Sequence, residues 1–177
     1  VELGYRLTLN TTDPLNPEVL QKIYELGQVV EYFHAASLAV DDIQDDSLTR
    51  RGSPSLHVLY GQNIALNAGN WLYFWPFEAL HKLEVSDLTK LGLIQACHRT
   101  LLRAHFGQAL DVGVAIDKIT KDSVPNVSIA SVELKSGALM SLPITLGFIL
   151  ASQKYQPDHR ADTLDKFGHG FGIALQM

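Results

Sequence analysis

One stretch organises this chain: Phe33-His34-Ala35-Ala36-Ser37-Leu38-Ala39-Val40-Asp41-Asp42-Ile43-Gln44-Asp45-Asp46. It closes an apolar helical pattern that begins near Pro17, so it places clustered charge at the edge of a core, which is costly unless the charge has partners or a function. If the helix continues through the acidic run, Asp41 and Asp45 lie one turn apart on the same face. Two carboxylates in that geometry suit Mg²⁺, which takes carboxylate, water and phosphate oxygens.

Two adjacent arginines, Arg50 and Arg51, follow this stretch and precede Gly52. Their planar guanidinium groups offer paired N–H donors that match phosphate oxygens. Carboxylates and arginines together predict a polyanion held through metal on one side and through guanidinium on the other. The alternative is a solvated helix end with ordinary salt bridges, but the apolar residues before Asp41 favour a functional site.

The remaining sequence predicts an all-α fold, in a single domain that spans residues 1–177. Helical spacing of apolar residues recurs along the chain, and no stretch alternates with the period of a strand. Asn16 before Pro17, and Ser86, are predicted helix caps, while Ser53 before Pro54 is predicted to start a short helix. Further helices are expected over residues 63–83, 86–114, 138–151 and 158–176. The helix over 63–83 is apolar nearly all round, which predicts a central position in a bundle.

Composition excludes several classes of function. The 177 residues carry a formal net charge of −5 and no basic stripe, so nucleic-acid binding is not expected. The single cysteine, Cys97, excludes an intrachain disulfide framework and fits a reducing compartment, so we expect a cytoplasmic protein. Residues 136–153 lack Asp, Glu, Lys and Arg and approach the length of a membrane span. Their serines, threonine and proline favour a buried helix, and we expect no integral membrane protein.

Six polar residues stand at helix positions predicted to face inward: Asp41, Asp45, Gln108, Asp111, Lys135 and Gln176. Together they predict a cavity between helices with polar side chains at its rim, and helix bundles tend to have their binding sites in such cavities. Structural alternatives remain open for single members. Asp111 can anchor a neighbouring helix, and Lys135 can compensate a helix dipole. His34 can be a buried core histidine, and the aromatic residues 71–77 can be core.

The chain resembles the trans-isoprenyl diphosphate synthases, also called polyprenyl synthetases, in motifs that occur in the family's order and spacing. Residues 34–45 with Arg50-Arg51-Gly52-x-Pro54 resemble the family's first aspartate-rich motif. Three later elements also match: Gly107-Gln108-x-x-Asp111, Lys135-Ser136-Gly137-Ala138-Leu139, with serine for the usual threonine, and the run Phe171-Gly172-Ile173-Ala174-Leu175-Gln176 that leads into the second aspartate-rich motif. Within that family, the residues of these motifs most resemble those of the geranylgeranyl diphosphate synthases. The resemblance implies a helical bundle around a central cavity.

The resemblance also implies a reaction, the condensation of an allylic prenyl diphosphate with isopentenyl diphosphate, with geranylgeranyl diphosphate or a similar product. Asp41 and Asp45 would hold Mg²⁺ on the allylic diphosphate, with Asp42 assisting. Arg50 would contact that diphosphate, whereas Arg51 would contact the isopentenyl diphosphate.

Other residues receive implied roles on the same basis. His34 would also contact isopentenyl diphosphate. Lys135 and Ser136 would lie over the allylic substrate, Lys135 as a catalytic residue, and Gln176 would complete the pocket. Two aromatic residues, Tyr73 and Phe74, are candidates for the floor that stops chain growth. A homodimer is expected from the family.

Two family elements are absent from the sequence, which leaves the predicted bundle incomplete at both ends. A Gly-Lys-x-x-Arg motif for isopentenyl diphosphate should precede the helix that ends at Leu9, and Gly4-Tyr5-Arg6-Leu7 lacks the lysine. The second aspartate-rich motif should begin just after Gln176, but the sequence stops at Met177. We therefore expect the 177-residue chain alone to be inactive. Two alternative functions stay open: a class I terpene cyclase acting on one prenyl diphosphate, and a non-catalytic partner of an active synthase.

Overall fold

A computed structural model describes residues 1–153 and 159–174 of the chain, and it is helical apart from one small hairpin. The all-α prediction is confirmed. The chain forms two compact units, residues 28–82 and the remainder. The prediction of a single domain, and that of a central cavity, stay predictions.

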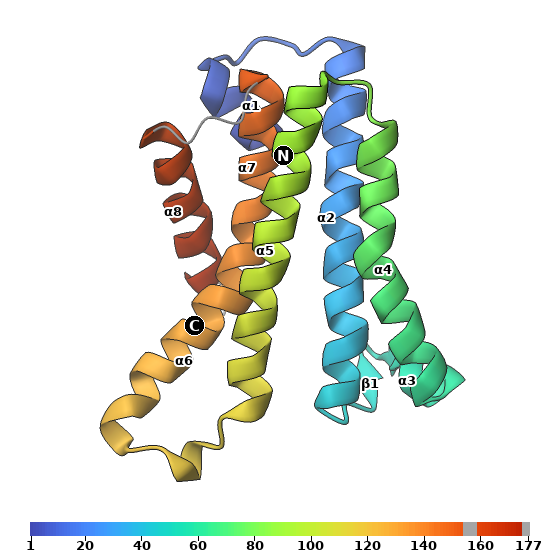
Figure 1. Cartoon of the computed structure of the whole chain (residues 1–177), viewed down its shortest axis with the longest axis vertical. Helices are drawn as coiled ribbons and strands as arrows, with labels where there is room; N and C mark the ends of the chain where they lie inside the picture. Colours follow the sequence, from blue (N-terminus) through green and yellow to red (C-terminus); the bar gives the residue numbers. More distant parts are fainter. Residues whose placement is uncertain (154–158, 175–177) are drawn as a thin grey trace. The chain divides into compact units, whose positions relative to one another are not determined.

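The larger unit combines residues 1–27 with the chain from Leu83 onward. It contains five α-helices among the described residues: α1 (Glu2–Leu9), α5 (Asp87–Gly113), α6 (Val124–Val132), α7 (Ala138–Ser152) and α8 (His159–Ala174) (Figure 1). Two short 3₁₀ turns, η1 (Ile116–Lys118) and η2 (Lys121–Ser123), connect α5 to α6, and a π-helical turn, η3 (Glu133–Gly137), joins α6 to α7.

The smaller unit takes most of α2 (Pro17–Gln44) and ends with α4 (Gln62–Lys82). Between them lie an antiparallel pair of two-residue strands, β1 (Thr49–Arg50) and β2 (Ser53–Pro54), and the short helix α3 (Leu56–Tyr60). The predicted helix start at Ser53 is therefore wrong. Arg51 and Gly52 both adopt positive φ angles and turn the chain into a hairpin, so α3 begins only after Ser55.

The predicted caps explain where two long helices begin. The side-chain oxygen of Asn16 accepts a hydrogen bond from the backbone N–H of Val19 at 2.8 Å, at the start of α2. The hydroxyl of Ser86 accepts one from the backbone N–H of Thr89 at 3.2 Å, at the start of α5. Each cap satisfies a donor that the first helical turn leaves unpaired.

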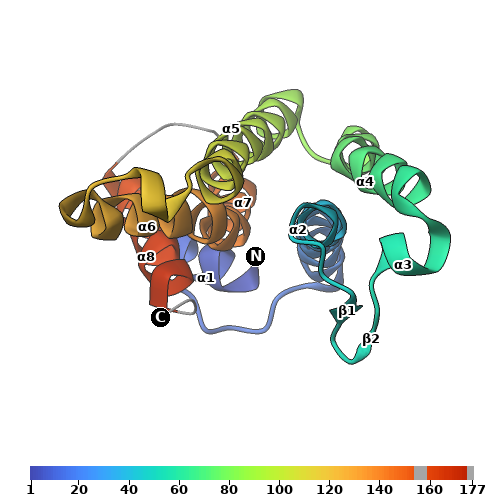
Figure 2. The same cartoon turned by 90° about the horizontal axis from the view of Figure 1, so that it is seen from below.

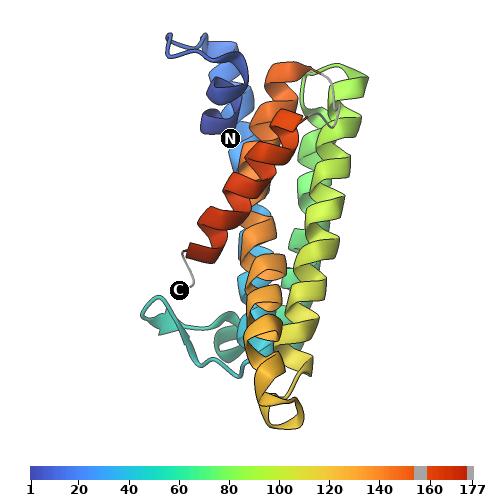
Figure 3. The same cartoon turned by 90° about the vertical axis from the view of Figure 1, so that its left-hand side faces the viewer.

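Helix α7 forms the core of the larger unit, with α1, α5 and α8 packed around it (Figures 2 and 3). Its contact with α1 depends on glycine. A Cβ added to Gly147 would lie 2.6 Å from the backbone nitrogen of Tyr5, so the two backbones meet directly. Helix α8 approaches closely at two of its three glycines, because a Cβ on Gly168 or Gly172 would overlap backbone of α7 or η3, whereas one on Gly170 would meet nothing within 4 Å.

One continuous helical segment, Lys121–Ser152, is long and apolar enough to cross a membrane by length and composition. Of its most apolar window, 56% is buried inside the structure. The core helix of a soluble bundle meets the same two criteria. The buried position of α7 agrees with the predicted buried helix. That the protein is not an integral membrane protein stays a prediction.

In the smaller unit, α4 packs one face against α2. Phe33 on α2 and Phe77 on α4 make an edge-to-face pair with ring centroids 5.8 Å apart, a favourable aromatic geometry. Nearby, a Cβ on Gly69 would lie 2.9 Å from the Val40 side chain, so the helices approach closely there. The opposite face of α4 is exposed and apolar, which differs from the all-round burial expected of this helix; it carries Ile64, Trp71, Phe74 and Trp75.

Candidate functional site

The aspartate cluster lies at the end of α2 in the smaller unit. The backbone N–H of Asp45 donates to the carbonyl of Asp41 at 2.9 Å, so helical geometry continues just past Gln44 and keeps both carboxylates on one side, as predicted. Asp41 is half-buried and Asp45 is exposed, whereas the Asp42 side chain is only 5% exposed. The helix stops at Asp46, whose positive φ of 53° breaks the repeat.

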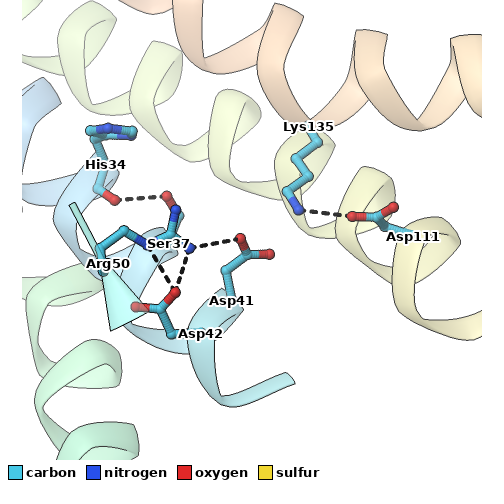
Figure 4. Close-up of polar contacts among 7 residues, drawn as sticks. All are labelled: His34, Ser37, Asp41, Asp42, Arg50, Asp111 and Lys135. Carbon is cyan, nitrogen blue, oxygen red and sulfur yellow. Dashed lines mark hydrogen bonds and ion pairs between the residues drawn. The ribbon is translucent and has the colours of Figure 1, made fainter. Parts of the chain in front are cut away.

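Arg50 is bound to the buried Asp42 (Figure 4). Its Nε–H donates to Asp42 Oδ1 at 2.9 Å, and its NH2 group donates to the same oxygen. The NH2 group also lies 3.7 Å from Asp41 Oδ2. The hydrogen bond to Asp42 raises the pKa of Arg50, desolvation opposes it, and the charges of Asp42, Asp41 and Asp45 raise it further. The guanidinium is therefore charged and held in one orientation beside the cluster.

The hairpin separates the two adjacent arginines. Arg50 pairs with Ser53 across the strands, and Arg51 and Gly52 form the two-residue turn with φ angles of 51° and 79°. Positive φ at both positions is what a type I′ hairpin turn requires. Arg50 thus lies against the end of α2, while Arg51 is exposed at the tip.

Replacing Gly52 with alanine is expected to destabilise the hairpin by about 1–2 kcal/mol, because a Cβ disfavours the left-handed region. Replacing Arg51 with glycine is expected to relieve the same strain. Urea unfolding measures both changes, and amide exchange at Ser55, whose N–H donates to the Leu48 carbonyl at 3.0 Å, reports on the hairpin itself. Unchanged exchange and stability in Gly52→Ala would contradict the strain argument.

Tyr73 and Phe74, the predicted floor residues, face different ways on α4. Burial raises the pKa of Tyr73 to about 12, and the negative charge of Asp41 contributes, so this phenol lies within electrostatic range of the cluster. Phe74 stands about 100° further round the helix and is 72% exposed. The structure brings only Tyr73 toward the aspartates, and the floor role of both stays a prediction.

The raised pKa of Tyr73 predicts a pH effect on stability. The unfolded phenol titrates near 10 and the folded one near 12, so the folded state keeps its proton longer. Its stabilising contribution is complete below pH 10 and is lost as the pH rises from 10 toward 12. Urea midpoints of the parent should therefore fall more steeply than those of Tyr73→Phe across this window. Parallel curves would show that Tyr73 titrates as an exposed tyrosine.

A second polar cluster lies in the larger unit, at the π-helical turn η3. Lys135 in this turn donates from Nζ to Asp111 Oδ2 on α5 at 2.8 Å (Figure 4). Single π-helical turns inside α-helices occur frequently at functional sites. The structure thus joins two of the predicted elements, the one at residues 107–111 and the one at 135–139.

Small residues let three helical segments meet at this turn. A Cβ on Gly107 would overlap the Lys135 backbone nitrogen and lie 2.8 Å from the Leu134 carbonyl carbon. The Ser131 hydroxyl donates to the Gly107 carbonyl at 3.3 Å. On the other side, a Cβ on Gly172 of α8 would lie 2.9 Å from the carbonyl oxygen of Ser136. The backbone that carries Lys135 and Ser136 is therefore held from two directions.

The remaining predicted site residues are placed as follows. His34 is half-buried, and its carbonyl accepts a hydrogen bond from the Ser37 hydroxyl at 2.8 Å (Figure 4). Gln176 lies outside the described residues. The two clusters belong to different units.

The metal prediction can be compared with the donors present. Among the side chains that the structure describes, no three His, Cys, Asp or Glu residues form a group that could hold a metal ion. Asp41 and Asp45 fit a Mg²⁺ site that completes its octahedron with water and phosphate oxygens. Asp42 fits less well, because Arg50 occupies its Oδ1. Metal binding by the three aspartates remains a prediction.

Sequence reasoning missed two pairings, Asp42 with Arg50 and Asp111 with Lys135. All four residues had been singled out as candidate site residues, but their pairing with one another had not been predicted. The first pair had a usable signal, since the Arg51-Gly52 dipeptide is compatible with a tight turn that folds Arg50 back. The second pair spans 24 residues and two helices, and no local pattern indicates it.

Comparisons with known proteins are consistent with this geometry. A family model described as polyprenyl synthetase matches residues 5–177. The chain is 41% identical to a geranylgeranyl pyrophosphate synthase of Neocamarosporium betae over 96 residues, which cover 54% of this chain and 26% of that protein. It is 32% identical to quiannulatene synthase of Emericella variicolor over 148 residues, or 84% of this chain and 19% of that one.

Among solved structures, the geranylgeranyl pyrophosphate synthetase of Pyrococcus horikoshii matches with a TM-score of 0.81 and 26% identity, covering 99% of this chain and 51% of that one. The chain therefore spans about half of this structure and smaller shares of the two curated relatives. The family match extends over nearly the whole sequence, including both polar clusters. The chain belongs to the polyprenyl synthetase family, that of the trans-isoprenyl diphosphate synthases.

Proposed function

We propose that this chain provides the diphosphate-ionising part of a trans-prenyltransferase, which condenses an allylic prenyl diphosphate with isopentenyl diphosphate. The observation that carries the proposal is the arrangement at the end of α2. An arginine held by a buried carboxylate lies beside Asp41, which shares a helix face with Asp45. This arrangement offers a fixed cation and two metal-binding carboxylates to one anionic group.

The reaction requires such a site, because breaking the allylic carbon–oxygen bond leaves negative charge on the departing diphosphate. Asp41 and Asp45 would hold Mg²⁺, which neutralises that charge. Arg50 adds preorganised N–H donors to the same group. The double bond of isopentenyl diphosphate then forms a carbon–carbon bond to the allylic cation, and the adduct loses a proton, for which diphosphate is a suitable acceptor.

Other residues are assigned supporting roles. Lys135 would contact the allylic diphosphate. Its ammonium group is partly exposed and pairs with Asp111, and it could leave that carboxylate to bind the more highly charged diphosphate. Ser136 and Gln176 would orient dipoles toward the cation in a dry cavity. Arg51, exposed at the hairpin tip, and His34 would contact isopentenyl diphosphate.

The product is proposed to be geranylgeranyl diphosphate or a similar chain, in line with the names of two relatives. A cyclase acting on a single prenyl diphosphate is the second candidate, and the similarity to quiannulatene synthase favours it. The third candidate, a non-catalytic partner subunit, is opposed by the complete set of acidic residues in the first motif.

We also propose a homodimer, supported by the exposed apolar face of α4, where Trp71 and Trp75 stack with centroids 4.9 Å apart. Such a face is unusual on a monomer. A cytoplasmic location, no nucleic-acid partner and no membrane insertion complete the proposal.

The test is an assay of the purified chain and of the full-length gene product with Mg²⁺, radiolabelled isopentenyl diphosphate and each allylic primer. Chromatography of the products should show elongation by the full-length protein and its loss in Arg50→Met and in excess chelator. Hydrocarbon formed from one prenyl diphosphate without isopentenyl diphosphate would establish the cyclase instead. No product under any condition would favour the non-catalytic subunit.

A further inference from the structure

We infer that Asp42 is a positioning residue that fixes Arg50 for a diphosphate, and that it is not a ligand of the metal. This inference rests on the proposed function, because it assigns the anion to the same end of α2. It departs from the expectation that Asp42 assists Asp41 and Asp45 in holding Mg²⁺.

Burial separates Asp42 from its two neighbours. Its side chain is 5% exposed, against 16% for Asp41, and Asp45 is exposed. Successive helical residues point about 100° apart, so Asp42 leaves the face that Asp41 and Asp45 share. A carboxylate this buried needs a charged hydrogen-bonding partner, and the structure supplies Arg50.

The hydrogen bonds to Asp42 hold the Arg50 guanidinium in place. Both Nε–H and NH2 of Arg50 donate to Asp42 Oδ1, and charge-assisted bonds of this kind are among the strong ones in proteins. Two donors on one acceptor fix the plane of the guanidinium as well as its position. An arginine carries further N–H donors, and the Arg50 side chain is 37% exposed, so these donors remain accessible to an anion.

The hairpin strengthens this assignment. Arg50 lies in β1, whose pairing with β2 limits its backbone, and the turn at Arg51–Gly52 directs the next arginine elsewhere. Binding to a fixed guanidinium costs less side-chain entropy than ordering a mobile one. Asp42 would therefore contribute affinity and orientation for the diphosphate without touching it or the metal.

The test compares Asp42→Asn with the matched control Asp41→Asn, using Mn²⁺ as a spectroscopic probe and inorganic diphosphate as the anion. Asp42→Asn is expected to weaken diphosphate binding about tenfold while leaving the Mn²⁺ midpoint, read by electron paramagnetic resonance, within about twofold of the parent. Asp41→Asn is expected to raise that midpoint about tenfold or more. Isothermal titration calorimetry measures the affinity of each variant for inorganic diphosphate.

Two further readouts isolate the positioning role. The Arg50 Nε–H should give a slowly exchanging signal in ¹H–¹⁵N spectra, and Asp42→Asn should abolish that protection. Arg50→Lys should weaken diphosphate binding as Asp42→Asn does, and the double variant should lose little more, since the two residues act as one unit. Additive losses would overturn the inference.

The outcomes separate this inference from the proposed function. If the parent binds both probes and Asp42→Asn raises the Mn²⁺ midpoint as much as Asp41→Asn, then Asp42 is a metal ligand and the inference alone fails. If the parent binds neither diphosphate nor Mn²⁺, the proposed function fails, and the inference fails with it whatever the Arg50 signal shows.

Discussion

Replacing Gly107 with alanine is expected to destabilise the chain by about 1–3 kcal/mol, the usual cost of overpacking a tight contact, and to disturb the Lys135–Asp111 pair. The new Cβ would overlap the backbone nitrogen of Lys135 and lie 2.8 Å from the Leu134 carbonyl carbon. These are backbone atoms, which cannot rotate away as a flexible side chain would. Helix α5 must therefore move off η3.

The displacement should also be visible in function. If Lys135 contacts the allylic diphosphate, a shift of about 1 Å in a positioned group can cost on the order of a hundredfold in rate. Gly107→Ala in the full-length protein should then lower kcat more than the loss of folded protein explains. Circular dichroism at the assay temperature corrects for the unfolded fraction.

Gly113→Ala is the matched control, because Gly113 ends the same helix and an added Cβ meets nothing within 4 Å. Alanine there should be neutral or stabilising by up to about 1 kcal/mol, from helix propensity. Urea unfolding of both variants measures the difference in their stability. Equal stabilities would mean that α5 and η3 adjust without cost.

Local signals in the sequence account for most of the helix positions. Asn16 and Ser86 cap the helices they were expected to cap, because a cap depends only on residues within one turn. The hairpin at residues 49–54 was missed for a related reason. Arg51 is an unusual residue for a positive φ angle, and two-residue strands have no room for an alternating pattern.

The candidate site was predictable as a list of residues but not as a set of contacts. Asp41 and Asp45 follow from helical spacing alone, and the structure keeps them together. Asp42 differs from them in pairing with Arg50, and this pairing depends on the hairpin that brings Arg50 back to the end of α2. The Lys135–Asp111 pair depends on the approach of two helices at Gly107, which no local pattern in the sequence indicates.

Phe33→Ala is expected to give the largest loss of stability, about 3–5 kcal/mol, as for other large-to-small changes at buried aromatic residues. Phe33 is 1% exposed and packs edge-to-face on Phe77, so its removal leaves a cavity between α2 and α4. That cavity would lie two helical turns before the aspartate cluster. The loss should therefore appear both in urea unfolding and as weaker protection of the Arg50 Nε–H.

Phe74→Ala provides the contrast, since this phenylalanine is 72% exposed on the other face of α4. Its stability should stay within about 0.5 kcal/mol of the parent, as is usual for surface substitutions. Phe74→Ala also bears on the chain-length floor when it is compared with Tyr73→Ala. A floor must be lined by side chains that face the substrate, and only Tyr73 faces the cluster. Tyr73→Ala should therefore lengthen the products and Phe74→Ala should not; longer products from Phe74→Ala would show that this exposed residue meets the growing chain in the assembled protein.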